Sequence, residues 1–502
     1  MNRIYYLLFV LLFIAPTAVF TQTIKFSDYD GEDNRNMNFD IIGKMNDKIL
    51  VYKNIRWRHK ISVYDNDMKT LKSVGMAFVP EKTFNIDFIA YPDFFYMIYQ
   101  YQKRNVLYCM AVKMNADAKP LSEPVLLDTT QIPVLTDNKI YSTIISEDKK
   151  KIMIFKIQTN NQKFNMATLL FDDQMNLIKK GRQLLDYNDR RDNFDNYLLA
   201  NDGTLVLTYD RQSGNRDNSN TLALYTLAPL QDLFTMHNIE LNEKYIDQVK
   251  LKIDNLNNRY IINTFYYKKN RGSIEGLFTC IWDKGKEKKY AAQFTELGDG
   301  IRDEVKRDGL LRFAFDNFFI RQVVIKTDGG FILTAEDYSS QSRSNNSWNR
   351  YDYLYNPYSL PSGSYYYNPY TGYYRPVTNF NDQNTRYFYE NIFVLSVSKT
   401  GQAEWYKVIQ KDQFDDNEDN FMSFLTLINK GEIHFLFNDD KKYRIISDQG
   451  ISPDGTLKRY ATIKSDQKGY EFMPSLGKQI GANQVIIPCA YRNTICFAKV
   501  SF

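Results

Sequence analysis

The feature that most constrains the fold of this chain is an apolar pattern that recurs every ~45 to 55 residues, the length of a four-stranded propeller blade. In each unit a polar turn precedes a strongly apolar strand. The turns are rich in Asn, Asp and Gly, which tolerate the positive φ that tight hairpins require. The turns and strands are Asn46-Asp47 before 48–52, Pro92-Asp93 before 94–99, Glu147-Asp148 before 151–155, Asn201-Asp202-Gly203 before 204–208, Asn257-Asn258 before 259–263, Asp328-Gly329-Gly330 before 331–334, Asn429-Lys430-Gly431 before 432–436, and Gly481-Ala482-Asn483 before 484–487.

A third apolar strand follows in every unit, and a weaker fourth strand completes most of them. In some units an Asn-Phe pair precedes the first strand, and its Phe is expected to pack between adjacent sheets. These residues are Phe39, Phe194, Phe318 and Phe421. The third strands are expected at 60–65, 106–114, 166–171, 221–227, 276–283, 391–398, 442–447 and 494–502.

The two ends of the chain complement each other. The last unit has no fourth strand, whereas residues 23–27 form a spare strand ahead of the first unit. Pairing of the two ends would close a ring and remove an exposed sheet edge. We therefore predict an all-β fold, a single β-propeller of eight blades over residues 22–502, closed by pairing of the N-terminal strand with the last blade. Seven blades and a pair of β-sandwiches are the alternatives.

Composition agrees with a sheet protein. Aromatic residues make up 15% of the chain, with 38 Tyr and 34 Phe, and such side chains suit a pleated, half-buried surface. The net charge is only +5, from 64 basic and 59 acidic residues that are mixed throughout the chain. A nucleic-acid binder usually carries a dense basic stripe, so DNA and RNA are not expected partners.

The first residues are typical of a signal peptide. Arg3 precedes an apolar run over 4–15, which is shorter than the roughly 20 residues that span a bilayer. Cleavage is expected near Thr21–Gln22, which makes residues 1–21 the signal peptide and places the mature chain in the periplasm, in association with the outer membrane or free of it. An uncleaved anchor is the alternative. No later apolar run is long enough to span a membrane.

Two of the cysteines are candidates for a disulfide. A turn centred on Arg492–Asn493 would place Cys489 opposite Cys496, and an exported protein could oxidise the pair. A shift of one residue in register would instead send the two side chains to opposite faces. Cys109 and Cys280 lie within apolar strands and are expected to be buried thiols.

The predicted propeller gathers its long loops on one side. Loops between second and third strands and connections between blades share this side, which we call the loop-rich face. Its largest member is an insertion over 338–390, and long loops of this kind are usually functional or disordered. Tyr offers large contact area with a hydroxyl group, so the insertion is a candidate partner-binding surface, with a lid over its own propeller as the alternative. The tyrosines are Tyr351, Tyr353, Tyr355, Tyr358, Tyr365, Tyr366, Tyr367, Tyr370, Tyr373 and Tyr374.

Two shorter segments share the loop-rich face. Arg56, Trp57 and Arg58 form a basic and aromatic hairpin tip that could bind an anionic group, or could be a solvated tip. The acidic run 415–419 could offer oxygen ligands to Ca²⁺, but it lacks the alternating spacing and Gly of an EF-type loop. A solvated charge run is the favoured interpretation, so no metal site is assigned.

The sequence contains no catalytic or cofactor motif. Its three His have no zinc-site spacing, and no nucleophile elbow, P-loop or dinucleotide glycine run occurs. No cofactor and no catalytic residue are therefore predicted. A glycosidase needs only two carboxyl groups placed correctly in space, so a carbohydrate-binding or carbohydrate-cleaving propeller is the alternative.

The run Asp328–Glu336 and the segment Asn391–Trp405 resemble exported, propeller-like envelope proteins of the Bacteroidota. The resemblance covers mainly residues 328–405. It implies an envelope location and a partner among outer-membrane or secretion proteins. The expected function is accordingly a non-catalytic binding or scaffold protein of the cell envelope that docks a protein partner through the loop-rich face.

Overall fold

The computed structural model describes residues 22–28, 37–132, 140–214, 217–285, 290–306, 310–342, 350, 354, 385–416, 418–439, 441–465 and 469–502. The expected signal peptide and all of the tyrosines singled out in the insertion lie outside these residues.

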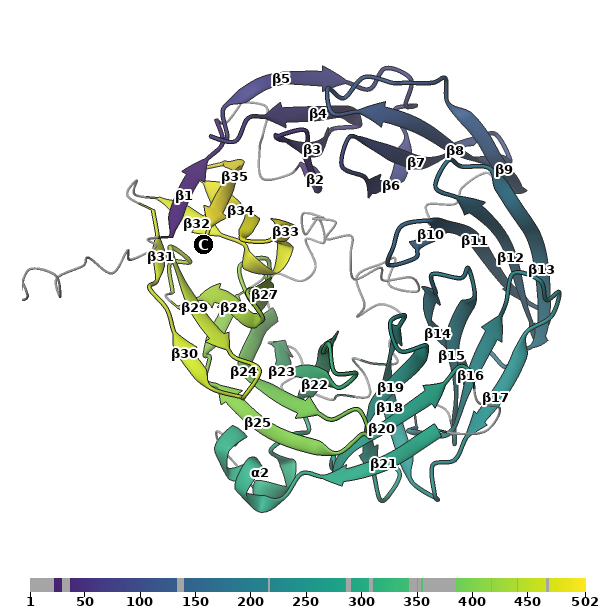
Figure 1. The fold of residues 1–502 in the computed structure, drawn as a ribbon, viewed down its shortest axis with the longest axis vertical. Coiled ribbons are helices and arrows are strands. Elements are labelled where there is room, and N and C mark those ends of the chain that lie inside the picture. Colours follow the sequence, from purple (N-terminus) through teal and green to yellow (C-terminus); the bar gives the residue numbers. More distant parts are fainter. Residues whose placement is uncertain are drawn as a thin grey trace, which may run out of the picture.

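The chain forms antiparallel sheets that stand side by side around a ring (Figure 1). The first sheet contains β2 (Asn38–Met45), β3 (Lys48–Ile55), β4 (Arg58–Tyr64) and β5 (Thr70–Gly75). The second contains β6 (Thr83–Ala90), β7 (Phe94–Lys103), β8 (Val106–Asn115) and β9 (Val125–Gln131). The third contains β10 (Tyr141–Ile145), β11 (Lys151–Asn160), β12 (Lys163–Asp172) and β13 (Leu177–Asp186).

The next strands form one eight-stranded sheet that divides into two. Its halves meet at a single residue pair, Ser219 with Ile246. The fourth sheet is thus β14 (Asp192–Leu199), β15 (Leu205–Gln212), β16 (Ser219–Leu227) and β17 (Thr235–Ile239). The fifth is β18 (Tyr245–Asp254), β19 (Arg259–Tyr267), β20 (Gly276–Asp283) and β21 (Tyr290–Glu296).

The remaining sheets complete the ring. A short helix, α2 (Asp299–Val305), and a 3-10 turn, η1 (Leu311–Phe313), lead into the sixth sheet. That sheet contains β22 (Phe318–Ile325), β23 (Phe331–Ser342), β24 (Thr385–Val397), β25 (Ala403–Ile409) and β26 (Gln413–Asp416). The seventh contains β27 (Phe424–Asn429), β28 (Glu432–Asn438), β29 (Ile445–Ile451), β30 (Leu457–Arg459) and β31 (Ile463–Lys464). The last contains β32 (Tyr470–Phe472), the 3-10 turn η3 (Pro474–Leu476) beside it, β33 (Lys478–Gly481), β34 (Gln484–Tyr491), β35 (Thr494–Ser501) and β1 (Thr23–Phe26).

The last sheet takes its outermost strand from the other end of the chain. β1 pairs antiparallel with β35, from Thr23 opposite Ser501 to Phe26 opposite Ala498. The Ser27 amide donates to the Phe497 carbonyl at 2.8 Å, and the Ser27 hydroxyl accepts from the Phe497 amide at 3.0 Å. Figure 1 shows β1 lying outside β35 at the point where the first and last sheets meet.

Amide side chains join strands of neighbouring sheets. A Gln or Asn side chain offers both a donor and an acceptor, so it can satisfy the unpaired backbone of an adjacent strand. Gln479 on β33 accepts from the Ile428 amide at 3.2 Å and donates to the Ile428 carbonyl at 3.0 Å. Gln100 on β7 makes the same two bonds to Tyr141 of β10, each at 3.0 Å. These clamps hold consecutive sheets in register around the ring.

The apolar core is a series of layers between adjacent sheets. Phe39 packs between the last and first sheets, with its ring 5.2 Å from that of Phe497. Phe194 lies between the third and fourth sheets, and Phe318 between the fifth and sixth. Phe421 is buried in the same layer as Phe39. The expectation that these phenylalanines pack between sheets is confirmed.

A ring of antiparallel sheets, each built on four or five strands, is the architecture of a β-propeller. The predicted all-β propeller fold is therefore confirmed. Among the described residues, no helix is both long enough and apolar enough to cross a bilayer.

Candidate functional site

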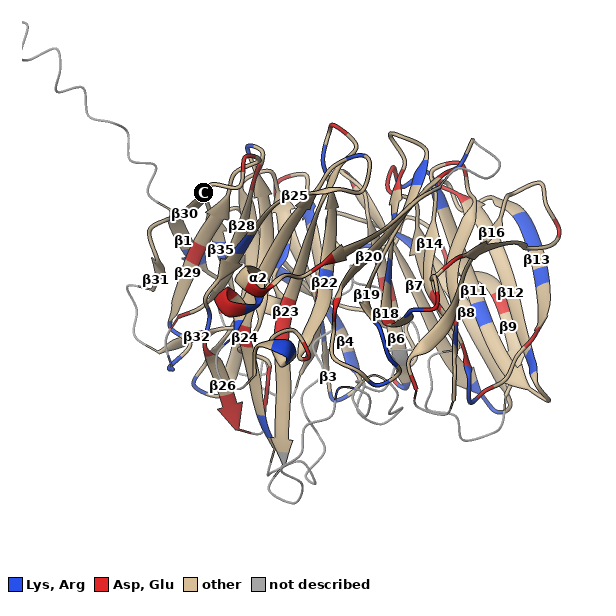
Figure 2. Cartoon of the chain, turned by 90° about the horizontal axis from the view of Figure 1, so that it is seen from below, with Lys and Arg blue, Asp and Glu red and all other residues tan. Residues whose placement is uncertain are grey.

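The sixth sheet projects from the loop-rich face. β23 and β24 continue as a ladder as far as the pair Ser342–Thr385, so both strands extend into the range assigned to the insertion. β26 pairs with the first part of β24, from Arg386 opposite Asp416 to Tyr389 opposite Gln413. Figure 2 shows the ends of β23, β24 and β26 standing out at the lower edge of the molecule. We call this three-stranded extension the projection.

The projection carries an aromatic side chain between two cations. Phe414 on β26 is 36% exposed, and its ring centroid lies 6.3 Å from that of Phe388. The Arg386 guanidinium lies 5.3 Å from the centre of the Phe414 ring, and the Lys441 ammonium lies 5.2 Å from it. Arg386 also donates to both carboxylate oxygens of Asp416, at 2.7 and 3.1 Å. The result is an exposed aromatic platform with a fixed charge pattern.

A buried ion network lies at the base of the projection. Glu336 on β23 is fully buried and pairs with the Lys411 ammonium at 2.9 Å. The Glu336 carboxylate also accepts from Arg321 Nε at 3.0 Å and from the Ser423 hydroxyl at 2.7 Å. Lys411 completes its bonds with the Tyr389 carbonyl and the Gln413 amide oxygen, each at 2.9 Å. Burial lowers the pKa of Lys411, and the Glu336 carboxylate opposes that shift.

One residue of the insertion is anchored in the propeller. Arg350 is buried, and its Nε lies 2.6 Å from the carboxylate of Asp247 on β18, which the Tyr267 hydroxyl also contacts at 2.5 Å. The Arg350 guanidinium donates to the Phe318 carbonyl and lies 4.1 Å from the centre of the Phe319 ring. At this point, therefore, the insertion packs onto its own propeller.

In the basic hairpin tip between β3 and β4, some side chains are exposed and the neighbouring His59 is buried. Arg56 and Trp57 adopt positive φ, at 50° and 67°, and with Arg58 they are exposed on the loop-rich face. Trp57 is 43% exposed. His59 points inward, where Nδ1 lies 2.6 Å from the Tyr52 hydroxyl and Nε2 lies 3.1 Å from the Glu81 carbonyl. Burial lowers the pKa of His59, so it adds no charge to the tip.

The acidic run after β25 has partners within the protein. Asp416 is held by Arg386, and Asp419 accepts from the Tyr389 hydroxyl at 2.8 Å. Burial raises the pKa of Asp415, and a hydrogen bond from Tyr443 opposes that shift. Within the described residues, no group of three or more His, Cys, Asp and Glu side chains is close enough to hold a metal ion.

The two candidate disulfide cysteines lie directly opposite each other on β34 and β35. Their Sγ atoms are 3.1 Å apart, both side chains are fully buried, and both thiols are free. Burial raises the pKa of Cys489 well above its usual value, with the neighbouring Cys496 thiol adding to the shift. The expected pairing of Cys489 opposite Cys496 is present, and the disulfide between them stays a prediction.

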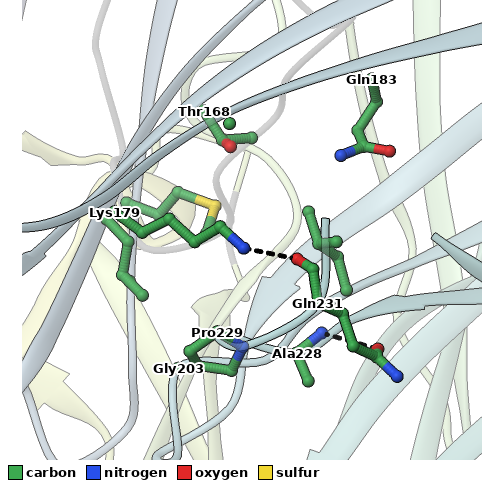
Figure 3. A pocket seen from close by; sticks show the side chains of 11 residues that line it. Thr168, Lys179, Gln183, Gly203, Ala228, Pro229 and Gln231 are labelled. Carbon is green, nitrogen blue, oxygen red and sulfur yellow. Dashed lines mark hydrogen bonds between the residues drawn. The ribbon is translucent and has the colours of Figure 1, made fainter. Parts of the chain in front are cut away.

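A crevice opens between the third and fourth sheets (Figure 3). Gly181 and Gly203 leave room there, and Leu170 and Pro229 contribute apolar walls. The Lys179 ammonium, the only charged group of its lining, donates to the Gln231 carbonyl at 2.6 Å. The Lys179 ammonium of the crevice is therefore already paired within the protein.

These features define a β-propeller with an elaborated face. No family model and no curated protein matches the chain. Among solved structures, it is similar to the polysaccharide lyase Uly1, with 9% identity, a TM-score of 0.41 and coverage of 82% of this chain and 89% of that one. It is also similar to a prolyl endopeptidase, with 8% identity and a TM-score of 0.41. That match covers 92% of this chain but only 56% of the endopeptidase. A third match is the β-propeller domain of the Trilobed protease from Pyrococcus furiosus, with 8% identity, a TM-score of 0.35 and coverage of 84% and 95% of the two chains. At such TM-scores no function is transferred.

Sequence reasoning found the loop-rich face but missed two of its features. The sequence places Phe414 directly before an acidic run, and only the pairing of β26 with β24 brings it beside Arg386. The anchoring of Arg350 joins residues 103 positions apart. The insertion also contains Arg343, Arg375 and Arg386, so the sequence neither singles out Arg350 nor points to a partner on β18.

Proposed function

We propose that this protein is a non-catalytic binding scaffold of the cell envelope that docks a protein partner through its loop-rich face. The observation that carries the proposal is the projection, which holds Phe414 exposed between Arg386 and Lys441. Aromatic and Arg side chains are enriched in protein interfaces and supply much of their binding energy.

Rigidity of the surface supports this role. β26 is pinned to β24 by four residue pairs, and the buried network of Glu336, Lys411 and Arg321 fixes the strands underneath. A surface that is already ordered loses less conformational entropy on binding than a free loop does. The exposed hairpin tip with Trp57 is a second contact region on the same face.

The proposed location rests on the N-terminal sequence pattern. An apolar run over 4–15 after Arg3 is the pattern of an exported chain. We expect the mature chain to begin near Gln22 and to be recovered with the periplasmic or membrane-associated fraction. N-terminal sequencing and fractionation of the native host measure both points, and recovery of an uncleaved chain in the cytosol would contradict them.

The docking test compares capture of envelope proteins by the tagged mature chain and by matched variants. Phe414→Ala and Arg386→Glu should each reduce recovery of the specific partner by about tenfold or more, because they remove the central contacts. Leu184→Ser changes an exposed side chain on an outer strand and should leave recovery unchanged. Equal recovery with the wild-type chain, with both projection variants and with a chain lacking 343–384 would contradict the proposal. Binding to a glycan array that Phe414→Ala abolishes favours carbohydrate as the ligand of this surface.

A further inference from the structure

The outer strand of the third sheet, β13, is a long open edge. It has ten residues and follows β10, β11 and β12 as the last strand of its sheet, and within the described chain no strand pairs with its outer side. Other outermost strands are shorter, with seven residues in β9 and β25 and six in β5. Figures 1 and 2 show β13 at the rim of the ring. Such an edge presents a row of unpaired backbone N–H and C=O groups, which can pair with another strand.

The neighbouring fourth sheet is held to β13 through side chains, which leaves the backbone edge open. The loop between β16 and β17 lies beside β13, where the Lys179 ammonium donates to the Gln231 carbonyl at 2.6 Å (Figure 3). Gln183 donates to the Asp232 carbonyl at 2.6 Å and accepts from the Phe234 amide at 3.3 Å. β13 also contains no Pro, the residue that most directly prevents pairing at an edge. The strand is therefore positioned precisely but not capped.

Exposed apolar side chains flank this edge. Leu177 and Ile178 on β13 are both exposed. The adjoining loop presents Leu230 and Leu233, which are 97% and 73% exposed. On the other side of β13, Leu126 of β9 is also exposed. Exposed apolar side chains that gather in one region are typical of interaction surfaces.

The two lysines in the middle of β13 are paired with acidic residues of the neighbouring sheets. The Lys179 ammonium lies 2.9 Å from the carboxylate of Asp232. The Lys180 ammonium lies 3.0 Å from the carboxylate of Asp128, which Lys156 also contacts at 2.6 Å. Asp128 thus serves two cations, and its single charge does not neutralise both.

Arg182 is the cation of β13 without an acidic partner among the described residues. Its side chain is exposed, and its Nε donates to the neutral side-chain oxygen of Asn165 at 2.9 Å. The one carboxylate on the strand, Asp186, is already paired with Lys163. The open edge therefore combines apolar contact area with an excess of positive charge at its centre.

We propose that the free edge of β13 binds an extended segment of a partner protein in which acidic and apolar side chains alternate, and that this segment adds a strand to the third sheet. Backbone hydrogen bonds supply affinity in this binding mode, and alternate side chains supply specificity. Acidic side chains would pair with Arg182 and Lys180, and apolar ones would contact Leu177 and Leu230.

A second copy of β13 is a poorer occupant. In an antiparallel two-fold pairing centred on the strand, the cations at 179–182 would lie opposite one another, and like charges directly opposite destabilise a sheet. The proposal is independent of docking at the projection, because none of its residues lies there. The two surfaces take separate ligands, so a variant of one should leave binding at the other unchanged.

The first test measures binding of labelled peptides to the mature chain by fluorescence anisotropy at constant ionic strength, since salt screens charge contacts. The probe is a peptide of about ten residues, the length of a long strand, that alternates valine with glutamate. A peptide that alternates valine with lysine is its control and should bind at least about tenfold more weakly. Failure of the glutamate peptide to bind at millimolar concentration overturns the proposal, as does equal binding of the lysine peptide.

The second test asks whether the peptide adds as a strand. Two versions of the glutamate peptide carry N-methyl groups on alternate residues, one version in each phase. Only one edge of an added strand faces β13, so one version should lose binding and the other should keep it. Equal binding of both versions, or loss of binding by both, overturns strand addition.

Matched variants connect the binding to β13. Arg182→Glu should weaken binding of the glutamate peptide about tenfold and strengthen binding of the lysine peptide. Leu230→Ser should weaken both, because it removes apolar contact. Arg459→Glu is the control, since Arg459 is an exposed arginine on β30, an outermost strand of the seventh sheet. Unchanged affinity in Arg182→Glu, or an equal loss in Arg459→Glu, overturns the assignment. Dimerisation that Arg182→Glu alters, without peptide binding, would assign the edge to a second copy instead.

Discussion

Asp210 shows how a single residue makes the stability of this fold depend on pH. It is 3% exposed, and its carboxyl group accepts from the Ser219 hydroxyl at 2.5 Å and from the Asn193 amide at 2.9 Å. Burial raises the pKa of Asp210 to about 7, the two hydrogen bonds oppose the rise, and the charges of Asp195 and Asp247 add to it. The folded chain therefore keeps a proton here at a pH where an unfolded chain has lost it.

The contribution of Asp210 to the free energy of unfolding should accordingly weaken as pH rises. Its folded pKa of about 7 lies above the ordinary value of 3.8, so the stabilisation is complete below about pH 4 and is lost as pH rises through about 7. We expect a decrease in the free energy of unfolding of up to about 4 kcal/mol over that window. Asp210→Asn should flatten this part of the profile, which urea unfolding at pH 5 and pH 8 measures. Asp186→Asn changes an exposed carboxylate on β13 and serves as the control. An identical pH slope in wild type and Asp210→Asn would show that Asp210 titrates normally.

The cysteine pair on β34 and β35 gives a second prediction at this scale. Because Cys489 and Cys496 are both fully buried and burial raises the pKa of Cys489, we expect oxidation of the pair to precede folding. Refolding with oxidised glutathione should release two reduced glutathiones per chain and join Cys489 to Cys496. The folded, reduced chain should resist the same reagent. Mass spectrometry after alkylation in denaturant should then label only Cys109 and Cys280, and the short loop limits the gain in stability to about 2 to 3 kcal/mol. Labelling of all the cysteines after oxidative refolding would rule out the bond.

At the scale of secondary structure, the β23–β24 hairpin and the anchor of Arg350 connect the insertion to the ring. Arg350 and Asp247 are both buried, and each compensates the charge of the other. Removing one partner of a buried ion pair leaves an uncompensated charge in a water-poor site, whereas removing both is far less costly.

Arg350→Met should therefore lower the free energy of unfolding by about 3 to 5 kcal/mol. The double variant Arg350→Met with Asp247→Asn should recover much of that loss, because no buried charge is then left alone. Arg56→Met, on the exposed hairpin tip, should change stability by less than about 0.5 kcal/mol. Denaturant unfolding of the four chains measures these differences. A double variant that is no more stable than Arg350→Met would show that the charge pair is not the cause.

Local chemistry explains which elements could be predicted from sequence. The turns of Asn, Asp and Gly were recognisable because their backbone needs positive φ, and Asn46, Asp47 and Gly203 have φ of 44°, 61° and 88°. The strands that follow them begin where expected, for example β3 at Lys48 and β34 at Gln484. The strands β23 and β24 extend farther than expected, because alternation through Tyr387, Phe388 and Tyr389 continues the ladder. Long-range pairs such as Arg350 with Asp247 leave no local signal, so the detailed site could not be predicted.

At the scale of the whole molecule, the pairing of β1 with β35 joins the two ends of the described chain. Phe26 stacks on Tyr470 with ring centroids 4.0 Å apart, and Gln22 donates to Asp448 on β29 at 2.7 Å. β1 covers the outer edge of β35, where backbone groups would otherwise be unpaired and open to another chain.

Deleting residues 22–27 should lower the free energy of unfolding by about 3 kcal/mol or more, from lost apolar burial and lost backbone pairing. The exposed edge of β35 should also promote self-association. Thr23→Ala, at the exposed end of β1, is the control and should be close to wild type. Unfolding curves and size-exclusion chromatography measure both effects. A truncated chain that is as stable and as monomeric as the full one would show that β1 is dispensable.

The shared sheet also sets an order of events during biosynthesis. β1 must wait for residues 494–501 before its sheet can be completed, whereas the first to seventh sheets each use one continuous stretch of chain. The last sheet of the nascent protein therefore stays incomplete until residues 494–501 are available to pair with β1. We therefore expect the contact between β1 and β35 to form later in folding than the hairpins within the other sheets.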